Sequence, residues 1–283
     1  MTRKLAPFFA LFLALAAAAP LAADIRFELG FGWTLVRPNM NATYLNRYQP
    51  AFTPPDRFIA GLAEQMVRFR GRTTYGLNGF FNVLFTENVG LQVLADWHRP
   101  KFSGSNDPYA ISVSFTAFEP ETYADEIEWG SSTGNMTTTA FSLNALARFR
   151  VADDLSLSVS AGPSVFHFEG KAGHIGYTFF DLAQNGDEFV LSGGTYRMVV
   201  DFGPQTKYGA NLGVEAAYEA FHNVILAVDL RYYAAPKTPL QLHVVEDELI
   251  TRPIDEIEAA IGLGTLDVNP SYLRAGLALR FIF

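Results

Sequence analysis

The chain ends with LRAGLALRFIF, residues 273–283, a stretch in which apolar residues largely alternate with polar or small ones. Apolar side chains occupy every second position from Leu273 to Phe283, while Arg274 and Arg280 belong to the alternate set. Two residues is the period of a β-strand, because successive side chains of a strand point to opposite faces. The stretch therefore predicts a final strand with one apolar face and one polar face.

Seven further segments alternate in the same way, which gives eight candidate strands. The eight segments are 25–36, 73–85, 89–97, 137–150, 155–166, 207–219, 224–233 and 273–283. Three connections are short, whereas the other four run to about 35 residues, at 37–72, 103–136, 169–206 and 234–270. Regular alternation of short and long connections is typical of a transmembrane β-barrel, in which periplasmic turns are tight and extracellular loops are long.

The predicted fold is all-β: a closed antiparallel transmembrane β-barrel of eight strands with short periplasmic turns and long extracellular loops. We expect closure because lipid offers no hydrogen-bond partners to the edge of an open sheet. Ten strands are the alternative if residues 173–180 and 189–202 also cross the membrane. Tight turns do not bracket these two stretches at membrane spacing, so we interpret them as a projecting hairpin, with its turn in DLAQNGDEF, residues 181–189.

The amino-terminal end indicates export. Arg3 and Lys4 precede an apolar run and then small residues, which is the pattern of a secretory signal peptide. We expect cleavage after Ala23, so that residues 24–283 form the barrel domain. Beyond this segment no stretch approaches the ~20 consecutive apolar residues of a membrane helix.

Composition excludes several classes of function. The chain carries a formal net charge of −8, which argues against nucleic-acid binding, and it has no cysteine for disulfides or thiolate metal sites. Its five histidines show no metal-ligand spacing. The chain contains no G-x-S-x-G motif. His167 and Ser164 would lie on opposite faces of one strand, so they make a poor catalytic pair. We therefore expect no catalytic residue, metal or cofactor, and a monomeric protein.

Outward-facing aromatic residues gather at two heights when the strands are aligned by their turns. Such girdles mark the two membrane–water interfaces of a barrel. The expected girdle residues are Trp33, Tyr75, Trp97, Tyr208 and Tyr232 near the long loops, and Phe27, Phe85, Phe149 and Tyr218 near the short turns, where Phe283 also falls.

In these features the chain resembles the small bacterial outer-membrane β-barrels, the OmpA-type and OmpW-type membrane domains. The resemblance is carried by the signal peptide, the eight amphipathic strands and the ending LALRFIF, residues 277–283. It implies a bacterial outer-membrane location and contact with outer-membrane lipid and lipopolysaccharide. It also implies that the barrel-assembly machinery reads the last strand, through Leu277, Leu279, Phe281 and Phe283.

Charged residues of both signs fall on the predicted inward faces. They are Arg26, Glu28, Asp96, Arg148, Arg150, Glu215, Glu219, Asp229, Arg231, Arg274 and Arg280. The interior of an eight-stranded barrel is about wide enough to be filled by side chains, and isolated buried ions are costly. We therefore favour a plug of salt bridges. The alternative is a narrow polar conduit lined by the same residues.

The first long connection is basic. If the second strand extends beyond the membrane, Arg68, Arg70 and Arg72 share its inner face and could contact an anion such as a lipopolysaccharide phosphate. The simpler interpretation, which we favour, is that these arginines pair with acidic residues of the second and fourth long connections.

Two stretches inside the long connections have helical spacing, residues 54–66 and 252–264. Each could cap the mouth of the barrel or act as a gate for a hydrophobic ligand. Taken together, the residues favour a non-enzymatic structural or surface-interaction barrel. A narrow channel for small or hydrophobic solutes is the alternative, and a lipid-modifying enzyme is a third.

Overall fold

Eight strands pair edge to edge into a closed ring, and they correspond to the eight predicted segments. Their bounds are β1 (Arg26–Pro38), β5 (Thr74–Leu84), β6 (Val89–His98), β10 (Ser132–Arg150), β11 (Leu155–Asn185), β12 (Glu188–Phe221), β13 (Val224–Ala234) and β16 (Tyr272–Ile282). The computed structural model describes residues 25–48, 51–52, 58–116, 120–185, 188–248, 253–261, 263 and 265–283. The expected signal peptide, residues 1–23, lies outside the described residues.

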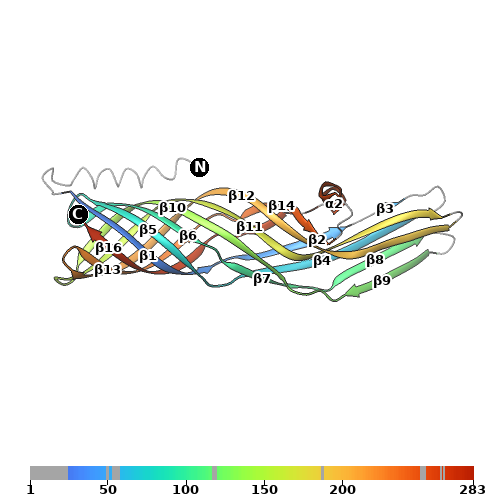
Figure 1. Ribbon diagram of the computed structural model, residues 1–283, viewed down its shortest axis with the longest axis horizontal. Helices are drawn as coiled ribbons and strands as arrows, with labels where there is room; N and C mark the ends of the chain where they lie inside the picture. The colour runs from blue at the N-terminus through green and yellow to red at the C-terminus, as the bar shows by residue number, and fades with distance from the viewer. Residues whose placement is uncertain are drawn as a thin grey trace.

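The first and last strands close the ring. β1 pairs with β16 from Glu28 opposite Ile282 to Pro38 opposite Tyr272, and its other edge pairs with β5. The remaining neighbours, β5–β6–β10–β11–β12–β13–β16, are also antiparallel. Short turns at 85–88, 151–154 and 222–223 lie at the end of the molecule that holds the carboxyl terminus (Figure 1). The prediction of a closed eight-stranded antiparallel barrel is confirmed.

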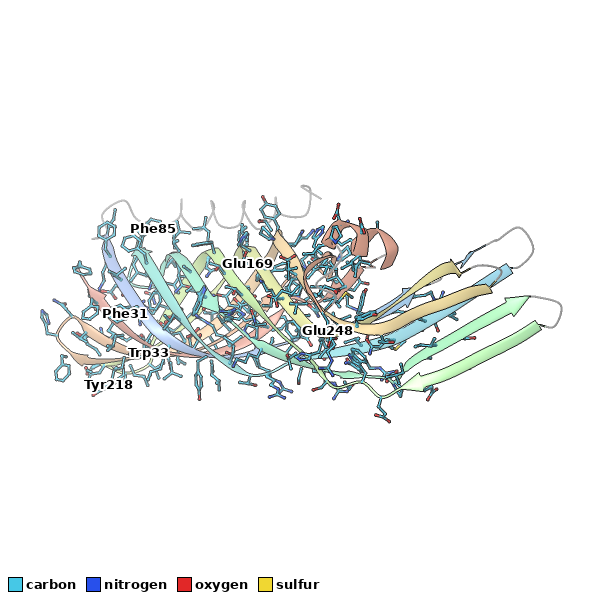
Figure 2. The ribbon with its side chains drawn as sticks, turned by 45° about the vertical axis from the view of Figure 1, so that its right-hand side comes forward. Phe31, Trp33, Phe85, Glu169, Tyr218 and Glu248 are labelled. Carbon is cyan, nitrogen blue, oxygen red and sulfur yellow. The ribbon has the colours of Figure 1, made fainter. Side chains whose placement is uncertain are left out.

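The outer face of this ring is apolar. Large apolar side chains point outward from all eight strands, and many are about half exposed, as Trp33 is at 64% and Phe31 at 50%. Phe85 and Tyr218 lie near the short-turn end of the barrel (Figure 2). A continuous apolar surface of this size is unfavourable in water and suits a membrane.

The long connections are largely strands rather than loops. They contribute β2 (Asn41–Tyr48), β3 (Ala51–Phe52), β4 (Phe58–Gly71), β7 (Lys101–Asn106), β8 (Tyr109–Thr116), β9 (Pro120–Ile127), β14 (Thr238–Asp247), α2 (Ile254–Ile261) and β15 (Thr265–Val268). With the distal parts of β10, β11 and β12 they form what we call the outer extension, which continues the barrel along its long axis (Figure 1).

Part of the outer extension repeats the barrel architecture. Strand ladders join β2–β4–β7–β10–β11–β12–β14–β15, so β10, β11 and β12 are shared with the membrane ring. β15 lies against β2, although no ladder joins these two strands among the described residues. Beyond this second ring, β8 and β9 project as a hairpin from β4 (Figure 1).

The polarity of the two faces of the wall is reversed between the membrane ring and the outer extension. Along β11 the outward side chains change from Leu157 to Glu169, while the inward ones change from Ser158 to Phe168. The outer extension accordingly has an apolar core, which α2 helps to cover with the fully buried Ile257. We take the level of this reversal as the boundary between lipid and water, because each face carries the side chains that its surroundings favour.

The structure corrects one expectation about the first long connection, the helix at residues 54–66. Residues 58–66, expected to be helical, belong to β4, and residues 53–57 lie outside the described residues. Ala63, Gln65 and Val67 are its buried positions, so the period is two rather than 3.6. The cause is pairing with β2, β7 and β8, which overrides local helical spacing.

Two other expectations for the long connections agree with the structure. Helix α2 forms within the predicted stretch 252–264. β11 and β12 pair out to Asn185 opposite Glu188, so residues 173–180 and 189–202 form the predicted projecting hairpin. The turn residues 186–187 lie outside the described residues.

Three glycines are each covered by a phenylalanine on the neighbouring strand. Phe80 lies opposite Gly30, and the same pairing joins Phe102 with Gly134 and Phe202 with Gly170. A Cβ at Gly30 would lie 2.2 Å from the Cζ of Phe80, so the missing side chain is what makes room for the ring. Such aromatic–glycine pairs fill the interior without strain.

Candidate functional site: the lumen of the membrane ring

Two clusters of charged side chains occupy the inside of the membrane ring. The lower cluster, nearest the short turns, is centred on Glu28, which is completely buried. Arg148 donates hydrogen bonds from Nη1 and Nη2 to the two Glu28 oxygens at 2.7 and 2.8 Å. Arg280 donates to Glu28 at 3.1 Å, and its other terminal nitrogen lies 3.1 Å from Glu215. Two guanidinium groups thus face two carboxylates.

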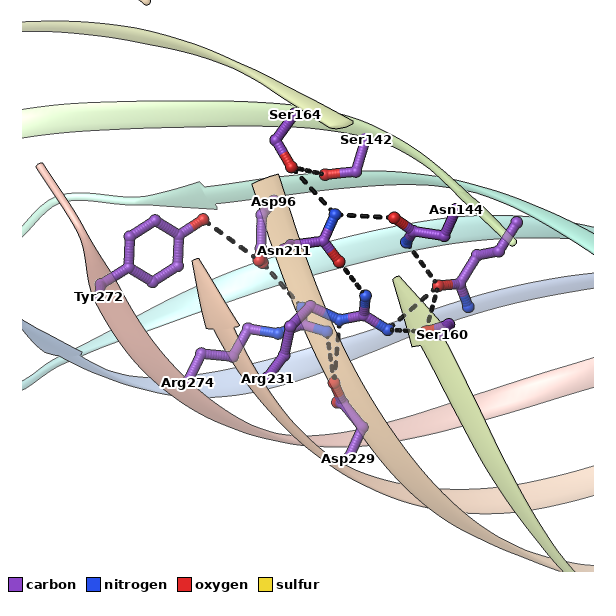
Figure 3. Close-up of polar contacts among 11 residues, drawn as sticks. Asp96, Ser142, Asn144, Ser160, Ser164, Asn211, Asp229, Arg231, Tyr272 and Arg274 are labelled. Carbon is purple, nitrogen blue, oxygen red and sulfur yellow. Dashed lines mark hydrogen bonds and ion pairs between the residues drawn. The ribbon is translucent and has the colours of Figure 1, made fainter. Parts of the chain in front are cut away.

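The upper cluster repeats this balance one layer farther along the barrel. Arg274 donates to Asp96 Oδ1 at 2.9 Å and to Asp229 Oδ2 at 2.5 Å. Arg231 lies 3.8 Å from the same Asp229 oxygen. All four side chains are buried (Figure 3). Because each cluster has two positive and two negative groups, the lumen carries no net charge at either level.

Neutral polar residues complete the upper cluster. Arg231 donates to Ser160 Oγ at 2.7 Å and to Gln92 Oε1 at 3.1 Å, and it also contacts Asn211 Oδ1. Asn211 in turn donates to Asn144 Oδ1 at 2.7 Å (Figure 3). Sequence reasoning missed these partners. These residues occupy inward-facing positions in the alternation of each strand, which was the available signal, but they are uncharged and only charged residues were predicted as lumen residues.

A layer of rings closes the lumen above the charges. Tyr233 and Tyr272 stack with ring centroids 4.4 Å apart, and His98 meets Tyr272 edge-on at 4.3 Å. The Tyr272 hydroxyl lies 3.4 Å from Asp96 Oδ2, which joins this layer to the upper cluster. Above it the apolar core of the outer extension begins. The described part of the lumen is therefore filled through its length.

Three of the predicted lumen charges lie at the rim and join neither cluster. Arg26 and Arg150 are exposed at the short-turn end, where Arg150 donates to the backbone carbonyl of Asp153 at 2.9 Å. Glu219, two residues before the end of β12, is half-buried. The other eight predicted lumen charges are buried or half-buried and belong to the two clusters.

The arginines of the first long connection do not share an inner face of an extended second strand. β4 ends at Gly71 and β5 begins at Thr74, and the two strands pair with different neighbours. Arg68, Arg70 and Arg72 are all exposed on the outside of the wall. Arg68 forms a two-pronged ion pair with Asp107 at 2.8 and 2.9 Å, so a partner from the second long connection satisfies it.

The predicted girdle residues face outward. Upper girdle residues Tyr75 and Tyr208 are 81% and 76% exposed, and the lower residues Phe149 and Tyr218 are more than half exposed. The terminal residues Leu277, Leu279, Phe281 and Phe283 share the outward face of β16, and the Phe283 amide donates to the carbonyl of Phe27 at 3.0 Å. Their role as an assembly signal stays a prediction.

Among the described residues, no helix is long and apolar enough to span a membrane. No group of three or more His, Cys, Asp or Glu side chains within those residues is arranged to hold a metal ion.

A closed ring with a lipid-compatible exterior and a self-neutralised polar interior defines an eight-stranded transmembrane β-barrel of the outer-membrane type. No protein-family model matches the chain, and no curated protein sequence matches it. Among solved structures it is similar to the outer membrane protein OprG from Pseudomonas aeruginosa, with a TM-score of 0.49, 10% identity and coverage of 92% of this chain and 97% of that one. It is also similar to the outer membrane protease OmpT from Escherichia coli, with a TM-score of 0.42, 9% identity and coverage of 92% and 96%.

Proposed function

We propose that this protein is a non-enzymatic, non-conducting barrel of the bacterial outer membrane, which holds the outer extension at the cell surface as a platform for contacts with lipid or other partners. The observation that carries the proposal is the filled lumen. Arg274 and Arg280 are at most 1% exposed, and each lies between two carboxylates of the lumen.

The construction of the outer extension supports a role at the surface. Paired strands with an apolar core hold an extended structure in one shape. Projecting hairpins, β8–β9 and the distal ends of β11 and β12, carry the wall far beyond the apolar belt (Figure 1). A rigid element at this distance can present a constant surface to a partner.

The alternative, passage of small or hydrophobic solutes, requires the two charge clusters to move. Separating Glu28 from Arg148 and Arg280 inside the barrel would leave buried ions unpaired, which is costly. No described contact suggests a second arrangement of these side chains, so we do not propose a channel.

The test is a planar-bilayer recording of the refolded chain 24–283. A folded, heat-modifiable sample should give no discrete current, while a known porin inserted in the same bilayers gives its normal steps. Reproducible unitary conductance from this protein would overturn the proposal. The non-enzymatic part is tested by incubating the same sample with lipid A, phospholipid and unfolded peptide. Turnover of any of them that is absent from a heat-denatured control would make the protein an enzyme.

We further propose that the barrel-assembly machinery recognises β16. The support is that the last strand closes the ring against β1 and ends on an outward-facing aromatic residue.

A further inference from the structure

Four basic side chains gather on one side of the wall. Lys101 of β7 and Lys171 of β11 both lie opposite Asn135 of β10, on its two edges. The backbone amide of Arg72 donates to the carbonyl of Lys101 at 2.9 Å, which places Arg72 next in line. Arg99 lies beside them and donates Nε and Nη2 to Asn135 Oδ1 at 3.1 and 2.9 Å. Because neighbouring strands are about 5 Å apart, these residues form a row across the wall, which we call the basic row.

The basic row lies at the level where lipid headgroups begin. Arg99 follows the outward-facing girdle residue Trp97 by two positions, so both side chains point to the same face. On β11, Lys171 stands above the point where outward side chains change from apolar to polar. Aromatic girdles mark the membrane–water interface, and phosphate groups of the lipids lie just outside it.

None of the four cations has an ion-paired carboxylate among the described residues. All four are exposed. Glu169 and Asp201 border the basic row, Asp201 directly opposite Lys171, without an ion pair to it. Neighbouring like charges destabilise a sheet. By contrast, Arg68 of β4, which is outside the basic row, has Asp107 as a bidentate partner. The chain therefore supplies a carboxylate to an exposed arginine elsewhere on the wall.

The surface beside the basic row is hollowed. A shallow pocket of about 250 Å³ is lined by the cations Arg99 and Lys171 and also by the carboxylates Glu169 and Asp201. Gly170 and Gly203 form part of its wall, and a Cβ added at Gly203 would meet no atom within 4 Å. Backbone without side chains therefore leaves space for a bulky group beside these cations.

We propose that the basic row binds the phosphate groups of a phosphorylated glycolipid in the outer leaflet, the chemistry of lipid A. The inference rests on the proposed function, because the extension must face outward for the basic row to meet that leaflet. Arginine and lysine donate charge-assisted hydrogen bonds to phosphate oxygens, and the pocket admits part of the sugar headgroup. Arg70 and the ion-paired Arg68 lie farther out along β4 and are not part of the site.

The test compares two triple variants with the same change of charge. One, the basic-row variant, removes three of the four cations of the row by Arg99→Gln, Lys101→Gln and Lys171→Gln, and leaves Arg72 in place. The other removes exposed cations elsewhere by Arg26→Gln, Arg150→Gln and Lys237→Gln. Refolded full-length mature proteins are titrated in detergent micelles containing EDTA with bis-phosphorylated lipid A, and binding is followed by native mass spectrometry. Lipid A without its phosphates and inorganic phosphate are titrated in parallel.

We expect the basic-row variant to bind bis-phosphorylated lipid A at least about tenfold more weakly than the parent, and the control variant to stay within about twofold. Dephosphorylated lipid A should bind all three proteins equally weakly. Equal loss in both variants, or no loss in either, would overturn the site. Binding of inorganic phosphate as tightly as lipid A would overturn the lipid as ligand. Bilayer recordings of the same samples separate this result from the proposed function, since a conducting parent refutes only the latter.

Discussion

Arg280, on the last strand, donates a 3.1 Å hydrogen bond to Glu28, on the first strand, although the two residues are 252 positions apart. Both side chains are completely buried. The contact spans the β1–β16 ladder that closes the ring, so closure and neutralisation of the lumen occur at the same place. Ring closure and charge neutralisation depend on each other, because a buried Glu28 or Arg280 without its partner would be too costly in an open or misaligned barrel.

The first prediction concerns this pair. Replacement Glu28→Ala should lower the free energy of unfolding by about 3–5 kcal/mol, because Arg148 and Arg280 would be left buried without their shared carboxylate. Arg26→Ala, on the same strand and parity but exposed at the rim, should change it by less than about 0.5 kcal/mol. Urea titration of the refolded protein in micelles measures both. Equal effects would show that the lower cluster adds nothing to stability.

The second prediction concerns the covering of Gly30 by Phe80. Gly30→Ala should destabilise the barrel by about 1–3 kcal/mol, because the new methyl group would overlap a ring that has little room to move. Combining it with Phe80→Leu should recover part of that loss, since a smaller side chain leaves space for the methyl group. A double-mutant cycle in urea measures the coupling between the two positions. Strict additivity would contradict the proposed contact.

The third prediction separates the outer extension from the membrane ring. Ile257 of α2 is completely buried, so Ile257→Ala should cost about 2–4 kcal/mol locally and loosen the helix. We expect faster protease cleavage near residues 253–261 with unchanged heat-modifiability of the barrel. Ile254→Ala on the same helix is the control, because Ile254 is 41% exposed and its loss should have little effect. Collapse of the whole barrel in the first variant would show that the two parts fold as one unit.

The fourth prediction tests recognition of the last strand. Phe283→Ala removes a side chain that is 75% exposed, so refolding of the purified protein into micelles should be nearly unchanged. In cells, the amount assembled in the outer membrane should fall several-fold if the assembly machinery reads this residue. Phe221→Ala, which removes an equally exposed aromatic at a short turn, is the control. A parallel fall in both variants, or in refolding itself, would point to stability rather than recognition.

The eight strands and their turns could be predicted because a half-buried strand has a local signal. Leu277, Leu279 and Phe281 alternate with polar or small residues whatever the rest of the chain does, and lipid on one side demands that pattern. The inward charges were recognisable for the same reason. Which of them pair was not, because Glu28 meets Arg148 and Arg280 only after strands distant in sequence come together.

The outer extension shows where local patterns fail. Residues 58–66 have helical spacing yet form β4, since the edges of β2, β7 and β8 offer hydrogen bonds that a lone helix could not match. The basic row has no signal in sequence either. Arg72, the pair Arg99 and Lys101, and Lys171 come from three separate stretches of the chain, which become neighbours only through the register of β7, β10 and β11.

A membrane barrel of eight strands with a polar interior is predictable from the residues alone, because the alternation of side chains along each strand reflects surroundings that act residue by residue. Three features become visible only in the folded chain: the interior is filled by two neutral clusters, the long connections continue the wall as an outer extension, and four cations share one level outside it. Those features depend on ladder register and ring closure, which relate residues tens to hundreds of positions apart and leave no mark on local periodicity.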